Sequence, residues 1–431
     1  MGKTIRVGML GLGTVGTGVY KVLTQNADAI ASRVGASISV EKIVVNNINK
    51  ERNIKIAPGV LTDNVEEVLD NQDIDIVVEV MGGIKPAQTY ILKALRGGKH
   101  VVTANKDLIA EHGKELFDAE KEHHTDLFFE ASVAGGIPII RPLKQCLAAN
   151  RVSGVMGIIN GTTNFILTKM TKEGRDFNDV LSEAQQLGYA EADPTSDIEG
   201  LDAARKTAIL ASVAFNTRVT YQDVYVEGIT KISPMDIKYA NELGYTLKLL
   251  GIAKDLEGQV EVRVHPVFIP NAHPLAAVND AFNAIFVTGD AVGETMFYGP
   301  GAGELPTASA VVADVIEVAR NIQSNVTGRI SCTCYEEKEI KPIGDITSKY
   351  YLRLIVKDEP GVLASIASVL GNQKVSIATV IQKRNVEDLA EVVLITHKVK
   401  EQNLQDALSI IKGMSITKDI ANVIRVEGED E

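Results

Sequence analysis

Short apolar runs alternate with amphipathic helical patterns over the first 149 residues, and this alternation strongly restricts the possible folds. The runs are rich in valine and isoleucine with few polar interruptions, which is typical of strands buried on both faces. Strands are predicted at residues 5–10, 38–45, 74–80, 100–103 and 127–130, and helices at residues 15–25, 86–95 and 108–123. Because helices separate the strands, we expect a doubly wound α/β domain with a parallel sheet at residues 1–149.

Beyond residue 149 the pattern changes to α+β. Residues 150–325 are expected to form a substrate and dimerisation domain, with long helices near 178–187 and 201–215 and strands near 154–159, 260–269 and 284–288. The apolar, alanine-rich helix at about 307–322 is expected to return to the first domain and complete it. Residues 326–349 are mostly polar and are interpreted as a linker. Residues 350–431 then show the order strand–helix–strand–strand–helix–strand, which predicts a ferredoxin-like domain.

Composition and charge exclude several classes of protein. The chain has 431 residues, 45% of them hydrophobic and 23% charged, which is ordinary for a chain that buries real cores. Its net charge of −12 disfavours nucleic-acid and anionic-membrane partners. No stretch approaches the roughly 18 apolar residues of a membrane span, and no secretory signal is apparent. Three cysteines cannot form a disulfide framework and are expected to be reduced thiols. A cytoplasmic protein is expected.

A glycine-rich sequence, GLGTVG, follows the first predicted strand and opens the first helix. In this strand–turn–helix context the pattern predicts a Rossmann-type dinucleotide site, because the glycines allow a tight turn and close approach of a pyrophosphate. The helix N-terminus then offers free N–H groups to the phosphates. The second strand ends with Asn46 and Asn47, followed by Lys50 and Arg52. These residues leave the choice between NAD and NADP open.

Three charged residues are candidates for the chemistry. Lys106 follows the fourth predicted strand and would project into the crevice at the carboxyl end of the sheet. Asp202 and Lys206 are spaced i, i+4 and share one face of an otherwise apolar helix. A carboxylate there can hold the amino group of an amino-acid substrate, and an ammonium can protonate a developing alkoxide. The structural alternatives are a solvent-exposed loop lysine and a surface ion pair.

The sequence closely resembles homoserine dehydrogenases over about residues 5–322. The matching segments are GLGTVG at 11–16, EVMGG at 79–83, TANK at 103–106, EASVAGGIP at 130–138, NGTTNFIL at 160–167, GYAEADP at 188–194, GLDAARK at 200–206 and GPGAGELPTA at 299–308. The resemblance implies reversible, NAD(P)-dependent reduction of L-aspartate 4-semialdehyde to L-homoserine, a step in threonine, methionine and isoleucine biosynthesis. No aspartate-kinase domain precedes these segments, so the single-function bacterial form is expected.

The resemblance also implies roles for individual residues. Lys206 matches the family's proton donor and Lys106 a second lysine beside nicotinamide and substrate, and which of them delivers the proton stays open. Glu191 and Asp202 match carboxylates that hold the substrate. The matched cofactor-binding positions are Gly11, Gly13, Thr14, Val15, Gly16, Thr103, Lys106, Gly188 and Gly303. The matched monovalent-cation loop comprises Glu130 and the carbonyls of Val133, Gly135 and Ile137, an all-oxygen set that suits Na⁺ or K⁺. Many bacterial relatives carry arginine in place of Asn46, so a simple NADP assignment does not follow.

The C-terminal region resembles an ACT domain, a small module that binds amino acids, often at dimer interfaces. The resemblance rests on VKDEPGVL at residues 356–363 and on the ferredoxin-like order of elements. It implies an amino-acid effector, with threonine the first candidate, and a homodimer or homotetramer. Two rivals are another NAD(P)-dependent oxidoreductase with an ACT domain and a non-catalytic sensor. The first would need a histidine paired with a carboxylate, which no histidine here matches, and the paired lysines and carboxylates argue against the second.

Overall fold

The computed structural model describes residues 4–386 and 388–428. Its first domain contains a six-stranded parallel sheet in the order β3-β2-β1-β4-β5-β6. The strands are β1 (Ile5–Leu10), β2 (Ile38–Val44), β3 (Leu61–Thr62), β4 (Ile76–Glu79), β5 (His100–Thr103) and β6 (Leu127–Phe128). The strand order reverses direction between β1 and β4, so the predicted doubly wound fold is confirmed and the crevice at that point is available to a ligand.

Helices cover both faces of this sheet because its strands are apolar on both sides. They are α1 (Thr14–Gln25), α2 (Ala27–Val34), α3 (Glu66–Leu69), α4 (Ala87–Arg96) and α5 (Lys106–Glu122). The α4–α5 face packs on Val77 and Val101, and the α1 face packs on Val7 and Met9. Helix α11 (Glu304–Gln323), which comes from much later in the chain, packs against α1 and joins the second core. A Cβ at Gly18 would overlap the carbonyl oxygen of Glu304, so glycine allows this close crossing.

The substrate domain is a sheet in the order β12-β11-β7-β9-β10, flanked by helices. Its elements are β7 (Val152–Ile158), α6 (Gly161–Glu173), α7 (Phe177–Gln186), α8 (Thr195–Ile198), α9 (Leu201–Ala214), β8 (Tyr225–Val226), α10 (Pro234–Glu242), β9 (Tyr245–Leu256), β10 (Gln259–Pro270), β11 (Phe282–Gly289) and β12 (Gly293–Pro300). The sequence did not predict β9, β12, α6 or α10. Strand β9 was not predicted because its two lysines interrupt the apolar pattern of a buried strand. In the structure Lys248 is nevertheless buried, and it donates hydrogen bonds to Asn164 and to the carbonyl of Val278.

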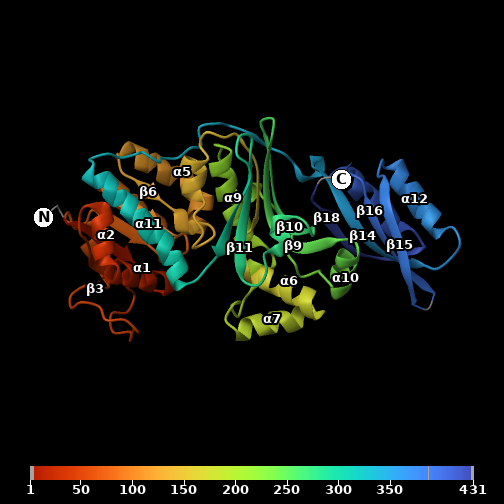
Figure 1. Cartoon of the computed structure of the whole chain (residues 1–431), viewed down its shortest axis with the longest axis horizontal. Coiled ribbons are helices and arrows are strands. Elements are labelled where there is room, and N and C mark those ends of the chain that lie inside the picture. Colours follow the sequence, from red (N-terminus) through yellow and green to blue (C-terminus); the bar gives the residue numbers. More distant parts are fainter. Residues whose placement is uncertain (1–3, 387, 429–431) are drawn as a thin grey trace.

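The C-terminal domain has the predicted order of elements and lies at one end of the molecule (Figure 1). It comprises β14 (Thr347–Lys357), α12 (Val362–Asn372), β15 (Ile377–Val386), β16 (Leu389–Thr396), β17 (Val399–Lys400), α13 (Glu401–Gly413) and β18 (Thr417–Val426). Its sheet continues the sheet of the substrate domain, because β18 pairs with β10 through Val267–Arg425 and Phe268–Val426. The polar segment before β14 adds β13 (Glu339–Ile340) to the same β10.

Among the residues that the structure describes, no helix combines the length and apolar character that crossing a membrane requires.

Candidate active site

Asp202 lies at the centre of the cluster of charged residues predicted from the sequence. It occupies the first turn of α9 and is 7% exposed. Its Oδ2 is 2.6 Å from Nζ of Lys206, one turn later on the same helix, and its Oδ1 is 3.4 Å from Nζ of Lys106. Lys106 belongs to the other domain, where it begins α5 directly after β5. The structure therefore brings both lysines to one carboxylate, and it places Asp202 and Lys206 on one face of α9, as their spacing predicts.

Asn160 connects this carboxylate to a second one. It lies between β7 and α6 and caps α6, since its Oδ1 accepts a hydrogen bond of 2.9 Å from the N–H of Thr163. Its Nδ2 donates to Oδ1 of Asp197 at 2.7 Å and to Oδ2 of Asp202 at 2.8 Å. Lys206 also donates to the carbonyl of Ile159, at 2.9 Å. Sequence reasoning assigned no role to Asn160 or Asp197, although both lie in or beside the quoted motifs.

The two carboxylates have opposite electrostatic environments. Burial alone would raise the pKa of Asp202, but the charges of Lys206 and Lys106 and hydrogen bonds from Lys206 and Asn160 outweigh burial and lower it. Burial raises the pKa of Asp197, and the negative charge of Asp202 adds to that effect. Asp202 is therefore held ionised beside two ammonium groups, whereas Asp197 is the more easily protonated member of the pair.

The strand ends beneath Lys106 are fixed by a buried glutamate. The carboxylate of Glu79, fully buried at the end of β4, accepts hydrogen bonds from the N–H groups of Met81 and Gly82, at 2.8 and 3.2 Å. It also accepts the hydroxyl of Thr103 at 2.6 Å. The predicted cofactor residue Thr103 thus has its hydroxyl committed within the protein. Asn105 caps α5 by accepting from the N–H of Leu108 at 3.1 Å, which fixes the start of the helix at Lys106.

The glycine loop between β1 and α1 has the geometry that a dinucleotide requires. Gly11 has φ +105°, and a Cβ there would lie 2.9 Å from the carbonyl oxygen of Val80. A Cβ at Gly16 would lie 2.5 Å from the carbonyl oxygen of Gly11, whereas one at Gly13 would meet nothing within 4 Å. No side chain caps α1, whose first residues are Thr14 and Val15. The loop therefore leaves open space before free helix N–H groups, which fits a pyrophosphate.

Other predicted site residues lie outside the lysine–carboxylate cluster. Glu191 is exposed on the loop before α8, and its carboxylate makes no hydrogen bond or ion pair with the described part of the chain. Gly188 and Gly303 both have positive φ, +77° and +127°, and Gly303 directly precedes α11. Because α11 crosses α1, Gly303 lies near the nucleotide-binding end of the first domain.

The carboxylate of Glu130 is occupied by main-chain donors. It accepts hydrogen bonds from the N–H groups of Ile139, Ile140 and Arg141, at 2.5 to 2.8 Å. By contrast, within the described residues the carbonyl oxygens of the buried Val133, Gly135 and Ile137 accept no hydrogen bond. Buried carbonyls without a donor are uncommon and call for a partner. These three oxygens are therefore available to a cation, whereas the Glu130 carboxylate is already occupied by main-chain donors.

Fold and site together define an oxidoreductase that binds a nicotinamide cofactor in its first domain and reacts at the seam with its second. Family models agree with this assignment: the NAD-binding domain of homoserine dehydrogenase matches residues 11–130, homoserine dehydrogenase itself matches residues 138–316, and an ACT domain matches residues 350–414. The chain belongs to the homoserine dehydrogenase family.

Individual relatives support this placement over the full length. The chain is 47% identical over 428 residues to the homoserine dehydrogenase of Bacillus subtilis, with 99% of each chain covered. The crystal structure of a homoserine dehydrogenase from Thiobacillus denitrificans superimposes with a TM-score of 0.94 at 45% identity, covering 99% of this chain and 98% of that one. A hyperthermophilic archaeal homoserine dehydrogenase in complex with NADPH covers 73% of this chain and 98% of its own, with a TM-score of 0.61 and 26% identity.

These findings confirm the function predicted from the sequence. The protein is an NAD(P)-dependent oxidoreductase acting on a CH–OH group, and it interconverts L-homoserine and L-aspartate 4-semialdehyde. The C-terminal module is confirmed as an ACT domain. The two rival functions are set aside, because the relatives match both the catalytic domain and the ACT domain as one unit.

Proposed function

We propose that Lys206 exchanges a proton with the substrate oxygen and that Asp202 holds Lys206 in position for this step. The observation that carries this proposal is the 2.6 Å contact between Lys206 Nζ and Asp202 Oδ2 at a buried helix start. When bound, the nicotinamide supplies hydride to the aldehyde carbon or accepts it from the alcohol. Negative charge then grows on the substrate oxygen during reduction, and the Lys206 ammonium stabilises and protonates it.

Lys106 and Glu191 are proposed to bind the substrate. Lys106 brings a second ammonium from the nucleotide domain to Oδ1 of Asp202, so substrate and cofactor meet beside it. The carboxylate of Glu191 is exposed and makes no described contact, so it is free to pair with the amino group of homoserine. Asp202 would hold the hydroxyl end, next to the proton donor.

Comparison of Lys206→Ala with Lys106→Ala tests the assignment of the donor. A positioned acid contributes about 10²–10⁴-fold, so Lys206→Ala is expected to lower kcat by that factor with little change in cofactor KM. Lys106→Ala is expected mainly to raise the KM for homoserine, because it removes binding energy common to ground and transition state. Near-native kcat in Lys206→Ala, with a collapse in Lys106→Ala, would transfer the donor role to Lys106.

The cofactor is proposed to be either NAD or NADP, held at Gly11, Gly13, Thr14, Val15 and Gly16. Asn46 is uncharged, so it offers no charged group that would distinguish the ribose hydroxyl of NAD from the ribose phosphate of NADP. The NADPH seen in the archaeal relative supports the phosphorylated form as one of the substrates. Initial rates with NADH and NADPH measure the preference directly.

The loop at residues 133–137 is proposed to bind Na⁺ or K⁺ through the carbonyl oxygens of Val133, Gly135 and Ile137. Its support is the lack of any described donor to these buried oxygens. Replacing Na⁺ and K⁺ by tetramethylammonium, which is too large for such a loop, should lower the unfolding temperature and the activity reversibly. Equal stability in all three salts at one ionic strength would contradict the proposal.

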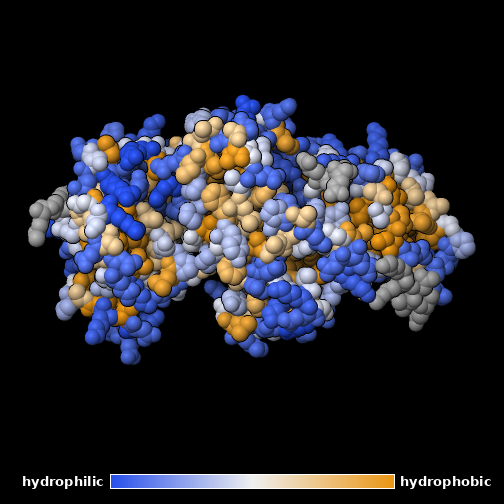
Figure 2. All heavy atoms as spheres, in the orientation of Figure 1, coloured by the Kyte–Doolittle hydropathy of each residue, from blue (hydrophilic) through white to orange (hydrophobic). Residues whose placement is uncertain are grey.

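The ACT domain is proposed to bind an amino-acid effector, with threonine the first candidate, in a homodimer or homotetramer. Figure 2 shows apolar residues gathered on its visible face, and Leu363 and Val380 are among its exposed hydrophobic side chains. Apolar surface of this kind is typical of assembly contacts. Light scattering gives the oligomeric state, and rates with and without threonine give the sign of the effect.

A further inference from the structure

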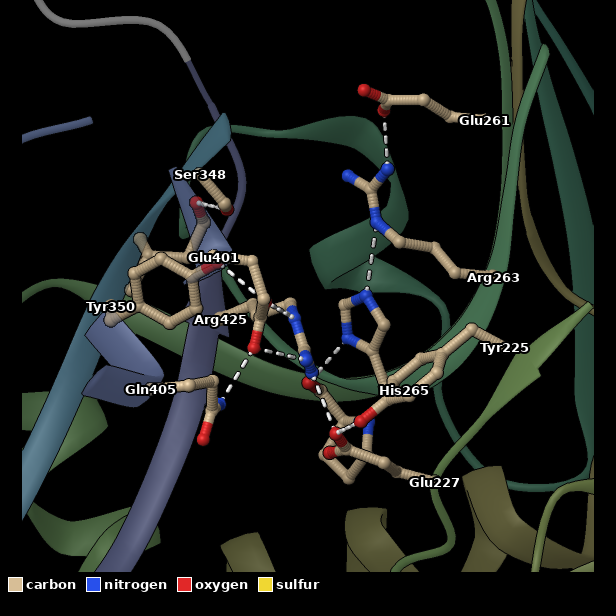
Figure 3. A network of polar contacts seen from close by, with 12 residues as sticks. Tyr225, Glu227, Glu261, Arg263, His265, Ser348, Tyr350, Glu401, Gln405 and Arg425 are labelled. Atoms are coloured by element: carbon tan, nitrogen blue, oxygen red, sulfur yellow. Dashed lines mark hydrogen bonds and ion pairs between the residues drawn. The ribbon is translucent and has the colours of Figure 1, made fainter. Parts of the chain in front are cut away.

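Arg425 joins the C-terminal domain to the substrate domain through an ionic network that is buried on the Arg425 side and partly exposed at Glu227 (Figure 3). It lies on β18 and is 4% exposed. Its Nε and Nη2 donate to the two carboxylate oxygens of Glu401, at 2.9 and 3.0 Å, within its own domain. Its Nη1 donates to Oε1 of Glu227 in the substrate domain, at 2.9 Å. The hydroxyl of Tyr350 also donates to Glu401, at 2.6 Å, and so holds the carboxylate that binds Arg425.

Glu227 is held from two directions. Its carboxylate accepts from Arg425 and from the hydroxyl of Tyr225, and its backbone N–H donates to the carbonyl of Val264 on β10, at 2.8 Å. The short strand β8, which immediately precedes Glu227 in the chain, also pairs with β10. A change in how β18 sits against β10 therefore displaces the partner of the Glu227 side chain.

The next residues pack directly on the junction between α8 and α9. A Cβ at Gly228 would overlap the carbonyl oxygen of Ile198 and lie 2.6 Å from Cα of Glu199. The N–H of Ile229 donates to the same Ile198 carbonyl at 2.8 Å. No space separates these two segments, so a displacement at Glu227 displaces the junction.

That junction carries both carboxylates bound by Asn160. Asp197 is on α8 and Asp202 is on the first turn of α9. A continuous set of contacts thus runs from Arg425 through Glu227, Gly228 and Ile198 to the carboxylates beside Lys206. We infer that Glu227 is a positioning residue that couples the seating of the ACT domain to the placement of Asp197 and Asp202, an inference that rests on the site roles proposed above.

The inference also says where an amino-acid effector would act on the enzyme. An effector changes activity only if it binds one arrangement of the protein better than another. Here the two arrangements differ in how β18 sits on β10, and Glu227 transmits that difference. A separate polar contact between the domains lies on α10, where the carboxylate of Glu391 accepts from the hydroxyl of Tyr239 at 2.6 Å and from Arg353 of its own domain at 3.2 Å. It makes no described hydrogen bond to the α8–α9 junction, which makes it a matched control.

The test compares Glu227→Gln with Glu391→Gln in the full-length enzyme. Each substitution removes one charge from a contact between the same two domains. Glu227→Gln is expected to lower kcat/KM for L-homoserine by at least about 5-fold, the lower end of typical coupling, and to leave the cofactor KM unchanged. Hydrogen–deuterium exchange of the peptide spanning residues 195–203 should increase in this variant. Glu391→Gln should match the wild type in both measurements.

Gly228→Ala provides a second variant at the next step of the path. Its Cβ would push against Ile198 without removing any charge, so it should also lower kcat/KM for homoserine and raise exchange at residues 195–203. Wild-type kinetics and exchange in Glu227→Gln would overturn the inference, as would equal effects from Glu391→Gln. A failure of the site roles would be distinguishable, because it would show as near-native turnover in both Lys206→Ala and Lys106→Ala.

Discussion

Lys106 and Asp202 contact each other across the boundary between the nucleotide domain and the substrate domain, with Nζ 3.4 Å from Oδ1. Lys106 begins α5 at the carboxyl edge of the parallel sheet, and Asp202 lies on the first turn of α9. The site proposed for substrate and nicotinamide therefore lies at this seam, where a small rotation between domains would separate Lys106 from Asp202. The first prediction follows from the residue that fixes Asp202 on its side of the seam.

Asn160→Ser is expected to reduce kcat by about 10- to 100-fold with little loss of stability. Serine preserves the cap of α6, but its single hydroxyl proton cannot bridge Asp197 and Asp202 as the two amide protons of Asn160 do, and small errors in position are costly in catalysis. Steady-state kinetics and thermal unfolding of the variant measure the two effects. Thr163→Ser, which stays on the same helix and donates no hydrogen bond to either carboxylate, serves as control. Native kcat in Asn160→Ser would mean that the carboxylates are placed by the lysines alone.

Gly13→Ala and Gly16→Ala should fail in different ways. The added methyl at Gly13 meets nothing within 4 Å, so the protein should fold normally but bind cofactor at least about 10-fold more weakly, because the methyl takes space meant for a phosphate. At Gly16 the methyl would lie 2.5 Å from the carbonyl oxygen of Gly11, so the fold itself should be destabilised. Cofactor titration and thermal unfolding separate the two outcomes. Equal cofactor affinity in Gly13→Ala and the wild type would place the pyrophosphate elsewhere.

Asn46→Arg is expected to shift the ratio of kcat/KM for NADPH over NADH upward by about 10-fold. One charge-assisted contact with the ribose phosphate is worth that much. The nearby Arg52 is already used, since its guanidinium donates to the carbonyls of Lys50 and Asn47, at 2.6 and 2.7 Å. Arg52→Ala should therefore leave the ratio unchanged. A wild-type enzyme that strongly prefers NADPH would show that Lys50 or Arg52 turns to hold the phosphate.

Stability between pH 5 and 8 should depend on Glu120, on α5. Burial raises the pKa of Glu120 to about 8. The unfolded chain ionises this group near its ordinary value of 4.5, whereas the folded protein keeps the proton until about 8. The unfolded state therefore holds fewer protons in this window, and the free energy of unfolding falls as pH rises through it. Glu120→Gln should flatten that decline, by an amount on the order of a few kcal/mol at pH 8.

Denaturant unfolding at pH 5, 6.5 and 8 measures this effect. Glu122→Gln, an exposed neighbour on the same helix, should leave the slope of the wild type unchanged. If Glu120→Gln had the same pH dependence as the wild type, another buried acid would have to account for the decline.

The sequence predicted the parts of this site that lie on one element or at one sheet edge. Asp202 and Lys206 are visible because four residues make one helical turn, and Lys106 because parallel strands end at a common edge. Asn160 and Glu79 act through contacts that form only when separate segments meet, so no local spacing indicates them. The same holds for Arg425, which in sequence is one polar residue in an ordinary strand, and whose partners Glu401 and Glu227 come from two distant segments.

The shared sheet also determines how the molecule comes apart. Asp236 on α10 is fully buried, and its carboxylate binds Arg353 at 2.7 Å and Asn422 at 2.9 Å, both from the C-terminal domain. Stripping such a buried charge of its partners costs about 3–5 kcal/mol, so the substrate domain does not keep its stability once the ACT domain melts. The nucleotide domain has its own sheet, but the core on the α4–α5 face of that sheet is continuous with the core of the substrate domain. Calorimetry should thus show the ACT domain and the substrate domain melting in a single transition, although each has its own fold.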